Sequence, residues 1–134
     1  QWNLVVNKEL CYCYLGDFDK AMIKTIKSEK NFNKTPVQEI WHNDGDQVLA
    51  YMRGDLLFVF NFSPTRSFTD YGFLVPTGAY SIVLDTDNKE FGGNGLNDDS
   101  MTHLTTYDPL YVGDRKEWLK LYLPARSALV LKKN

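Results

Sequence analysis

Cysteine and histidine are scarce in this 134-residue chain, which contains two of each. Cys11 and Cys13 are separated by one residue, and a disulfide between them would be strained because bridged Cα atoms prefer a separation of about 5.5–6 Å. With only His42 and His103 as further nitrogen ligands, the set needed for a metal site is missing. We therefore expect two reduced thiols, no metal and no cofactor.

An excess of basic charge and long apolar runs are missing as well. Lys and Arg number 15 against 17 Asp and Glu, which gives a formal net charge of −2. This balance offers no electrostatic attraction to a polyphosphate, so it argues against nucleic acid as a partner. No apolar run approaches the ~20 residues that cross a bilayer, and no basic amphipathic stretch suits a lipid surface. We therefore expect no membrane partner.

The sequence also lacks an export signal, and it begins Gln1-Trp2 without an initiator methionine. Together with reduced thiols, the missing signal predicts a cytoplasmic location. The missing start predicts that the chain is a piece of a longer protein.

Aromatic residues, in contrast, are plentiful at 14% of the chain, and they favour strands over helices. Leu56–Phe62 is apolar at nearly every position, which predicts a central strand that is buried on both faces. Turn residues separate it from other short runs that read as strands. These other predicted strands are Val37–Trp41, Gln47–Met52, Tyr80–Leu84, Thr102–Thr106, Glu117–Leu123 and Ser127–Leu131. The pattern predicts an all-β fold, an antiparallel Greek-key β-sandwich of about eight strands, with an exposed loop over 85–100.

The first 35 residues differ from the rest and predict a short N-terminal helical arm. Asp17 can cap a helix whose apolar side repeats at Phe18, Ala21, Met22 and Ile26. A shorter helix is expected just before it, broken at Gly16. We therefore predict a helical arm over 1–35 and a β-sandwich domain over 36–134. The apolar stripe of the arm must be covered, and we expect its cover to be missing from this chain, which is a second sign of a piece of a longer protein.

Catalytic patterns are not evident. Glycoside chemistry needs two carboxylates that flank one bond, and acidic residues in turns are far more often solvated turn formers or caps. The carboxylates considered are Asp70, Asp85, Asp87 and Glu90. Neither histidine lies near a nucleophile-elbow pattern, and Gly92-Gly93-Asn94-Gly95 lacks the Lys-Ser/Thr ending of a phosphate-binding loop. We predict no catalytic residue in this chain.

Sugar binding stays open from the residues alone. Aromatic rings stack on the apolar C–H faces of pyranoses, although strand aromatics more often serve the core or cross-strand pairs. The candidate sugar contacts are Trp41, Tyr71, Phe91 and Trp118.

Several motifs in one order resemble a known family. The segment Asn61–Tyr71 reads NFSPTRSFTDY, and it is followed by Val83–Asp87, Glu90–Gly93 and the run LPARSALVL at Leu123–Leu131. With Gln1–Leu4 and Tyr14–Met22 upstream, nearly the whole chain resembles the C-terminal domain of glycogen and starch branching enzymes, in the α-amylase superfamily. Two departures are Ser63, where the family often has His, and Asn94-Gly95-Leu96, where it commonly has His-Gly-Arg.

The resemblance implies a specific role. Branching enzymes cut an α-1,4-linked glucan and rejoin the released segment to a 6-hydroxyl by a retaining double displacement, and the family's catalytic carboxylates lie in a (β/α)₈ barrel. None of those carboxylates maps onto this chain. We therefore expect a non-catalytic domain of a cytoplasmic branching enzyme that caps the barrel and contacts it through Trp2, Leu4, Phe18 and Met22. The four aromatic candidates become candidate glucan contacts. The alternatives are a free-standing carbohydrate-binding module and, as the weakest, an independent enzyme.

Overall fold

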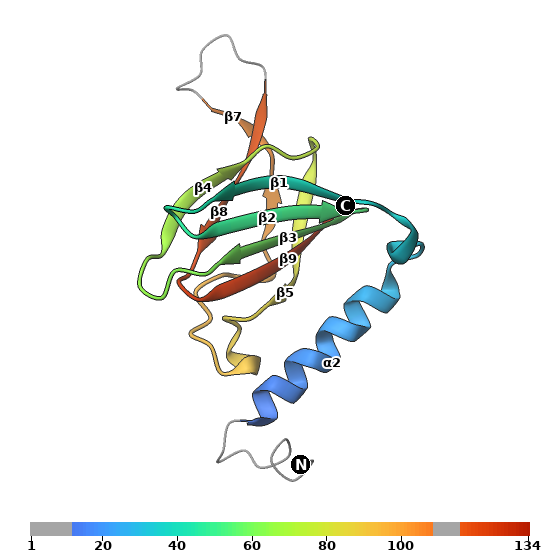
Figure 1. Cartoon of the computed structure of the whole chain (residues 1–134), viewed down its shortest axis with the longest axis vertical. Coiled ribbons are helices and arrows are strands. Elements are labelled where there is room, and N and C mark those ends of the chain that lie inside the picture. The colour runs from blue at the N-terminus through green and yellow to red at the C-terminus, as the bar shows by residue number, and fades with distance from the viewer. Residues whose placement is uncertain (1–11, 109–115) are drawn as a thin grey trace.

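Two antiparallel sheets pack face to face in the computed structural model, which describes residues 12–108 and 116–134 (Figure 1). The larger sheet has six strands, in the order β1 (Val37–Asn43), β2 (Val48–Arg53), β3 (Leu56–Asn61), β9 (Ser127–Lys133), β5 (Ala79–Asp85) and β6 (Thr102–Leu104). The smaller has β4 (Phe68–Phe73), β8 (Glu117–Leu123) and β7 (Thr106–Tyr107). The predicted all-β antiparallel sandwich is confirmed.

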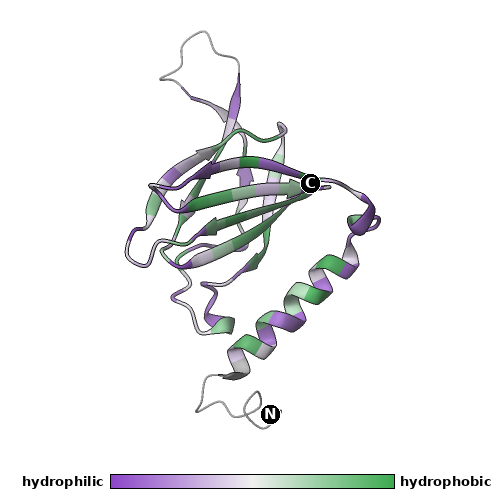
Figure 2. Cartoon of the chain, in the orientation of Figure 1, coloured by the Kyte–Doolittle hydropathy of each residue, from purple (hydrophilic) through white to green (hydrophobic). Residues whose placement is uncertain are grey.

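The main core lies between the two sheets. Side chains alternate along β2, so that Val48, Ala50 and Met52 are buried while the residues between them are more exposed. Phe73 on β4 and Leu121 on β8 are buried opposite them in the same apolar cluster. Each of the larger side chains among these stabilises the fold by about 1.5–3 kcal/mol through removal from water. Figure 2 shows the apolar residues concentrated on the strands.

The strand β3 is central, as its apolar run predicts. It pairs with β2 on one side and β9 on the other, and its residues are buried except for the half-buried Phe60. Leu57 and Val59 face the core between the sheets, whereas Leu56 and Phe58 belong to a second apolar cluster on the outer face of the larger sheet.

The helix α2 (Tyr12–Ser28) covers part of this outer face. Its residues Phe18, Ala21 and Met22 pack against the second cluster, and Glu29 just beyond the helix pairs with Lys132 of β9 at 2.7 Å. The expectation that the cover of this stripe is missing from the chain is therefore wrong, because the chain's own sheet packs against the stripe. Figure 1 shows the helix running along one side of the larger sheet, and Figure 2 shows apolar and polar segments alternating along it.

The predicted break at Gly16 is wrong, because one helix runs through this position. A glycine inside a helix costs only about 1 kcal/mol relative to alanine, and the packed apolar stripe offsets that cost. The expected helix start at Asp17 is also wrong, because the helix already begins at Tyr12. Within the described ranges, no helix has the length and apolarity that crossing a bilayer requires.

Two strand predictions also need correction. The expected strand over Thr102–Thr106 is divided between β6 in the larger sheet and β7 in the smaller one, with buried Thr105 at the crossing point. The strand β4 is absent from the sequence prediction, because a register shift between Phe68 and Tyr71 interrupts its alternation.

Candidate functional site

An aromatic pocket of ≈ 360 Å³ opens at the edge of the sandwich, beside β4. Its lining consists of Trp41, Phe68, Thr69, Asp70, Tyr71, Gly72 and Trp118. Three of the four predicted sugar contacts thus meet in one pocket, although they come from three strands in two different sheets.

The strand β1 presents Trp41 toward the second sheet. Trp41 pairs with Ala50, whose side chain is fully buried between the sheets, and paired residues of an antiparallel ladder share a face. The register shifts between Glu39 and Trp41. Because β1 is the edge strand, the indole is only partly covered and stays 46% exposed.

A hydrogen-bond chain fixes this indole. Trp41 Nε1 donates to the Tyr71 hydroxyl at 3.0 Å, and that hydroxyl donates to Asp46 Oδ2 at 2.9 Å. Burial is the main cause that raises the pKa of Tyr71; the bond from Trp41 lowers it, and Asp46 raises it. The hydroxyl therefore remains protonated at neutral pH and acts as a donor.

The ring of Tyr71 is also held from both sides. It lies edge-on to Phe68 at 5.2 Å between ring centroids and tilted against Phe73, also at 5.2 Å. Arg66 stacks over the Phe68 ring at 4.8 Å and pairs with Asp46 at 3.4 Å. Aromatic pairs of this kind contribute about 0.5–1.5 kcal/mol beyond area burial, so these contacts favour the observed orientation of the Tyr71 ring.

Asp70 lies on the pocket rim in a left-handed backbone conformation, with φ 52°. Non-glycine residues adopt this region at a cost of order 1–3 kcal/mol, and such residues cluster at functional sites. The bulge that holds it separates Phe68 from Tyr71 in the ladder with β8. Bulges re-aim side chains, and this one places an exposed carboxylate beside the aromatic rings.

Gly72 forms part of the pocket lining next to Trp118. A Cβ at this position would lie 3.6 Å from Cε3 of Trp118 on β8, so the missing side chain leaves the indole accessible across the strand. Glycines inside strands often mark places where another group approaches the backbone. The pocket can bind a flat apolar surface that carries hydroxyl groups, and its lining holds one carboxylate rather than a catalytic pair.

Phe91 does not line this pocket. It is the last residue of the short helix η3 (Lys89–Phe91), and its ring packs edge-on against that of Phe18 on α2, with 5.4 Å between ring centroids. Of the predicted inter-domain contacts, Phe18 and Met22 line an apolar pocket of ≈ 500 Å³ between α2 and the outer face of the larger sheet. Trp2 and Leu4 lie outside the described residues.

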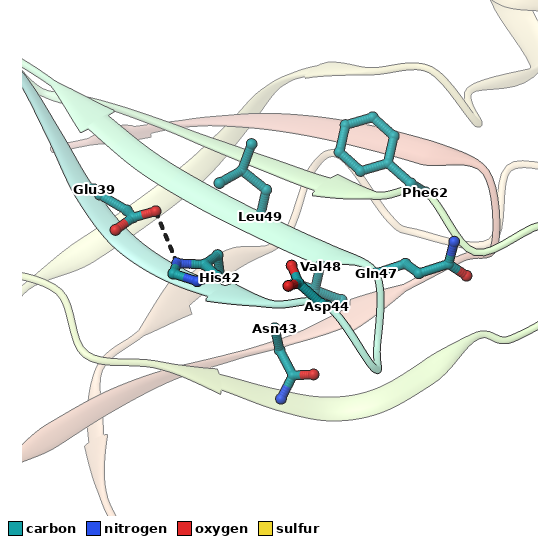
Figure 3. Close-up of a pocket in the computed structure, with 8 residues that line it drawn as sticks. All are labelled: Glu39, His42, Asn43, Asp44, Gln47, Val48, Leu49 and Phe62. Atoms are coloured by element: carbon teal, nitrogen blue, oxygen red, sulfur yellow. Dashed lines mark hydrogen bonds and ion pairs between the residues drawn. The ribbon is translucent and has the colours of Figure 1, made fainter.

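A third depression, of ≈ 470 Å³, lies at the β1–β2 turn on the outer face (Figure 3). Its rim carries the pair of Glu39 Oε1 and His42 Nδ1 at 3.0 Å, both side chains being 60% exposed. Ion pairs in such exposed positions are weak. Figure 3 shows the side chains of Leu49 and Phe62, which both line this depression, pointing to the same side of the ribbon. His103, in contrast, is half-buried on β6, and burial lowers its pKa.

The other three carboxylates considered as catalytic candidates do not line the aromatic pocket. Asp85 is buried, with 1% exposure, and accepts a hydrogen bond from the Asp87 amide at 2.8 Å. Asp87 itself accepts from the amides of Asn94 and Leu96, both at 3.1 Å, and so shapes the loop. Glu90 is exposed in η3.

Sequence reasoning missed the role of the first residue in the NFSPTRSFTDY segment. Asn61 is 2% exposed, and its Nδ2 donates to the backbone oxygens of Arg66, Leu123 and Pro124. Its Oδ1 accepts from the Ser63 amide at 3.0 Å. Through these hydrogen bonds Asn61 joins the turn that contains Ser63 and Arg66 to the turn that contains Pro124, and we call this arrangement the Asn61 clamp. A lone Asn at the end of an apolar run was the only signal for it.

The comparisons with known proteins agree with one another. Residues 40–134 match the family described as the alpha amylase C-terminal all-beta domain. Curated relatives are 1,4-alpha-glucan-branching enzymes from Emericella nidulans (43% identical over 133 residues), Candida glabrata (41% over 133) and Saccharomyces cerevisiae (39% over 132). Each alignment covers 98% of this chain but only 18–19% of the relative. The chain thus spans about a fifth of the length of these curated relatives.

Proposed function

The chain belongs to the alpha-amylase C-terminal all-beta domain family, and from this we propose that it is the non-catalytic C-terminal domain of a 1,4-α-glucan branching enzyme. The observation that carries the proposal is coverage: almost all of this chain aligns with about a fifth of each branching enzyme. The longer protein transfers α-1,4-linked segments to 6-hydroxyls in the cytoplasm and forms the α-1,6 branches of a glycogen-like polymer.

The positions of the carboxylates support a non-catalytic role. A retaining pair must flank one bond at a separation of about 5–5.5 Å, with access to substrate. Asp85 is buried, and Asp87 is engaged by two loop amides. The chemistry therefore belongs to the barrel of the longer protein, and this domain stabilises the barrel.

The outer face of the larger sheet is the surface that we assign to the barrel. Tyr51, Phe60 and Phe62 form a stacked row there, with ring centroids 5.9 Å apart for Tyr51–Phe60 and 5.5 Å for Phe60–Phe62. The helix α2 covers the side of β5 and leaves the end of this row uncovered, so that Phe62 is 58% exposed. Val37 on the same sheet is 57% exposed. An apolar surface of this kind marks an interaction site.

In this arrangement residues 1–35 form the arm that leads out of the barrel, and 36–134 form the sandwich. Trp2 and Leu4, which lie outside the described residues, remain predicted contacts with the barrel. Phe18 and Met22, which pack on the chain's own sheet, extend the apolar surface at the junction. Each large apolar side chain that is buried there adds about 1.5–3 kcal/mol to the docking.

Hydrogen exchange tests this assignment. The amides of α2 and β1 are expected to exchange more slowly in the longer protein than in the isolated 134-residue chain, whereas β8 exchanges alike in both. Phe62→Ser should abolish the added protection in the longer protein, and the matched change Tyr107→Ser, at an exposed ring on β7, should preserve it. Equal exchange of α2 and β1 in the two proteins would refute the docking surface.

A further inference from the structure

We propose that the pocket formed by Trp41, Tyr71 and Trp118 binds a stretch of α-1,4-linked glucan, as a docking site separate from catalysis. The choice of α-glucan as the sugar rests on the proposed function. The existence of a carbohydrate site rests on the geometry of the pocket.

The orientation of Trp41 is the first argument. An indole that is 46% exposed leaves a large apolar face in water. Here that face is held still, because Nε1 is bonded to the Tyr71 hydroxyl at 3.0 Å and the Tyr71 ring is packed between Phe68 and Phe73. A fixed and exposed ring loses little conformational freedom when a ligand binds, which favours affinity.

The polar groups around the rings are the second argument. Asp70 presents an exposed carboxylate from a strained bulge, and the exposed Thr69 adds a hydroxyl beside it. Carboxylate oxygens accept hydrogen bonds from vicinal hydroxyls, and charge-assisted bonds of this kind are roughly twice as strong as neutral ones. Apolar rings with a few polar groups at the margin match a pyranose, which has C–H faces and a rim of hydroxyls.

The charges near the pocket argue against single-stranded nucleic acid, the other polymer that binds proteins by stacking on aromatic rings. A single-stranded nucleic acid would need a positive groove along its backbone. Among the described residues near the pocket, Asp70 and Asp46 are acidic, and Arg66 is already paired with Asp46 at 3.4 Å. Lys120, the ladder partner of Gly72, is paired with Asp108 at 3.5 Å. A neutral polyhydroxylated chain meets no such repulsion.

The dimensions also suit a sugar. At ≈ 360 Å³ the pocket lies within the range of about 300–1,000 Å³ that small-ligand sites occupy. Gly72 keeps the side of Trp118 accessible across the edge strand. Trp118 lines the same pocket from the other face of the smaller sheet, so a glucan chain that follows the edge strand β4 can reach both Trp41 and Trp118.

Titration of the 134-residue chain with maltoheptaose tests the proposal. The indole N–H resonance of Trp41 is expected to shift saturably, and Trp41→Ala should weaken binding about tenfold or more, as for an aromatic anchor of an interface. Asp70→Asn, which keeps the size of the side chain, should weaken binding several-fold. Phe62→Ala, at a ring on the outer face that is 58% exposed against 46% for Trp41, should bind maltoheptaose like the unchanged chain. A matching β-1,4-linked oligosaccharide tests the preference for α-glucan.

Two outcomes would overturn the site: an unshifted Trp41 resonance at saturating maltoheptaose, or equal binding by the Trp41→Ala and Phe62→Ala variants. Neither outcome touches the proposed function, which depends on branching activity and outer-face docking in the longer protein. Conversely, if maltoheptaose binds here but the longer protein forms no branches, the site stands and the chain is a carbohydrate-binding module. Equal affinity for the β-linked sugar would overturn the assignment to α-glucan.

Discussion

Trp41 and Tyr71, thirty positions apart in the chain, are joined by a 3.0 Å hydrogen bond from the indole Nε1 to the phenolic oxygen. Trp41 belongs to β1 of the larger sheet and Tyr71 to β4 of the smaller one. The bond therefore crosses between the sheets at the open edge of the sandwich, where no strand of the described chain closes the gap. It both ties the sheets together and sets the orientation of the exposed indole.

Tyr71→Phe removes this bond and the one from the hydroxyl to Asp46 while it keeps the ring. We expect the free energy of unfolding to fall by about 0.5–2 kcal/mol, because Trp41 and Asp46 both lose a partner. Urea unfolding followed by circular dichroism measures the change. The control Tyr107→Phe, at an exposed tyrosine, should stay within about 0.5 kcal/mol. Equal midpoints for the two variants would show that the bridge adds no stability.

Asn61→Ala should be more damaging. It leaves the backbone oxygens of Leu123 and Pro124 without the amide that they share in a buried site. We expect a loss of about 2–4 kcal/mol in the free energy of unfolding. The exposed Asn33 provides the control, since Asn33→Ala should change the urea midpoint little. A loss below about 0.5 kcal/mol for Asn61→Ala would contradict the clamp.

Gly93→Ala tests the close packing of the loop after β5. A Cβ on Gly93 would lie 2.1 Å from the carbonyl oxygen of Asp87, which no local adjustment of a side chain relieves. The loop must move, at a cost of about 1–3 kcal/mol or more. Thermal unfolding measures it. Gly72→Ala, whose nearest atom would lie 3.6 Å away, should be nearly neutral, and a neutral Gly93→Ala would show that the loop is not packed as described.

Because of Asp85, we expect the free energy of unfolding to fall as the pH rises through the acidic range. Burial is the main cause that raises the pKa of Asp85 from 3.8 to about 6, assisted by the charges of Asp99 and Asp87 and opposed by the Asp87 amide. Between these two pH values the folded chain holds a proton that the unfolded chain has lost, so this group's contribution to stability falls as pH rises from about 4 to 6. A pKa change of this size corresponds to about 3 kcal/mol.

Asp85→Asn imitates the protonated form and should remove this contribution. The variant is expected to gain stability relative to the unchanged chain as pH rises from 4 to 7, by up to about 3 kcal/mol. Urea midpoints across this pH range test it, and Asp44→Asn, in the exposed β1–β2 turn, should run parallel to the unchanged chain. A constant difference between the Asp85 variant and the unchanged chain at all pH values would contradict the shifted pKa.

The sequence predicts the elements whose signal is local. The apolar run Leu56–Phe62 and the alternation over Gln47–Met52 correspond to β3 and β2 within a residue or two. It fails at β4, where the left-handed Asp70 interrupts the period of two. At Gly16 the sequence predicts a helix break that the structure does not have, because the helix is stabilised by packing against the sheet rather than by local propensity.

The candidate site is predictable only as a set of residue types. An exposed tryptophan on a strand suggests a ligand contact, but no local pattern tells that Trp41, Tyr71 and Trp118 converge. Their meeting depends on the pairing of β4 with β8 and on β1 being an edge strand. The sequence predicts Phe91 as a sugar contact on the same grounds, but its ring packs against Phe18 of α2 instead.

The most direct test of the central claim is a count of new α-1,6 branch points in amylose. Amylose is incubated with the 134-residue chain or with the longer protein that contains it, and the product is debranched with isoamylase before reducing ends are counted. The account predicts no branches above the buffer level from the isolated chain and abundant branches from the longer protein. Branches made by the isolated chain, or none made by the longer protein, would contradict it.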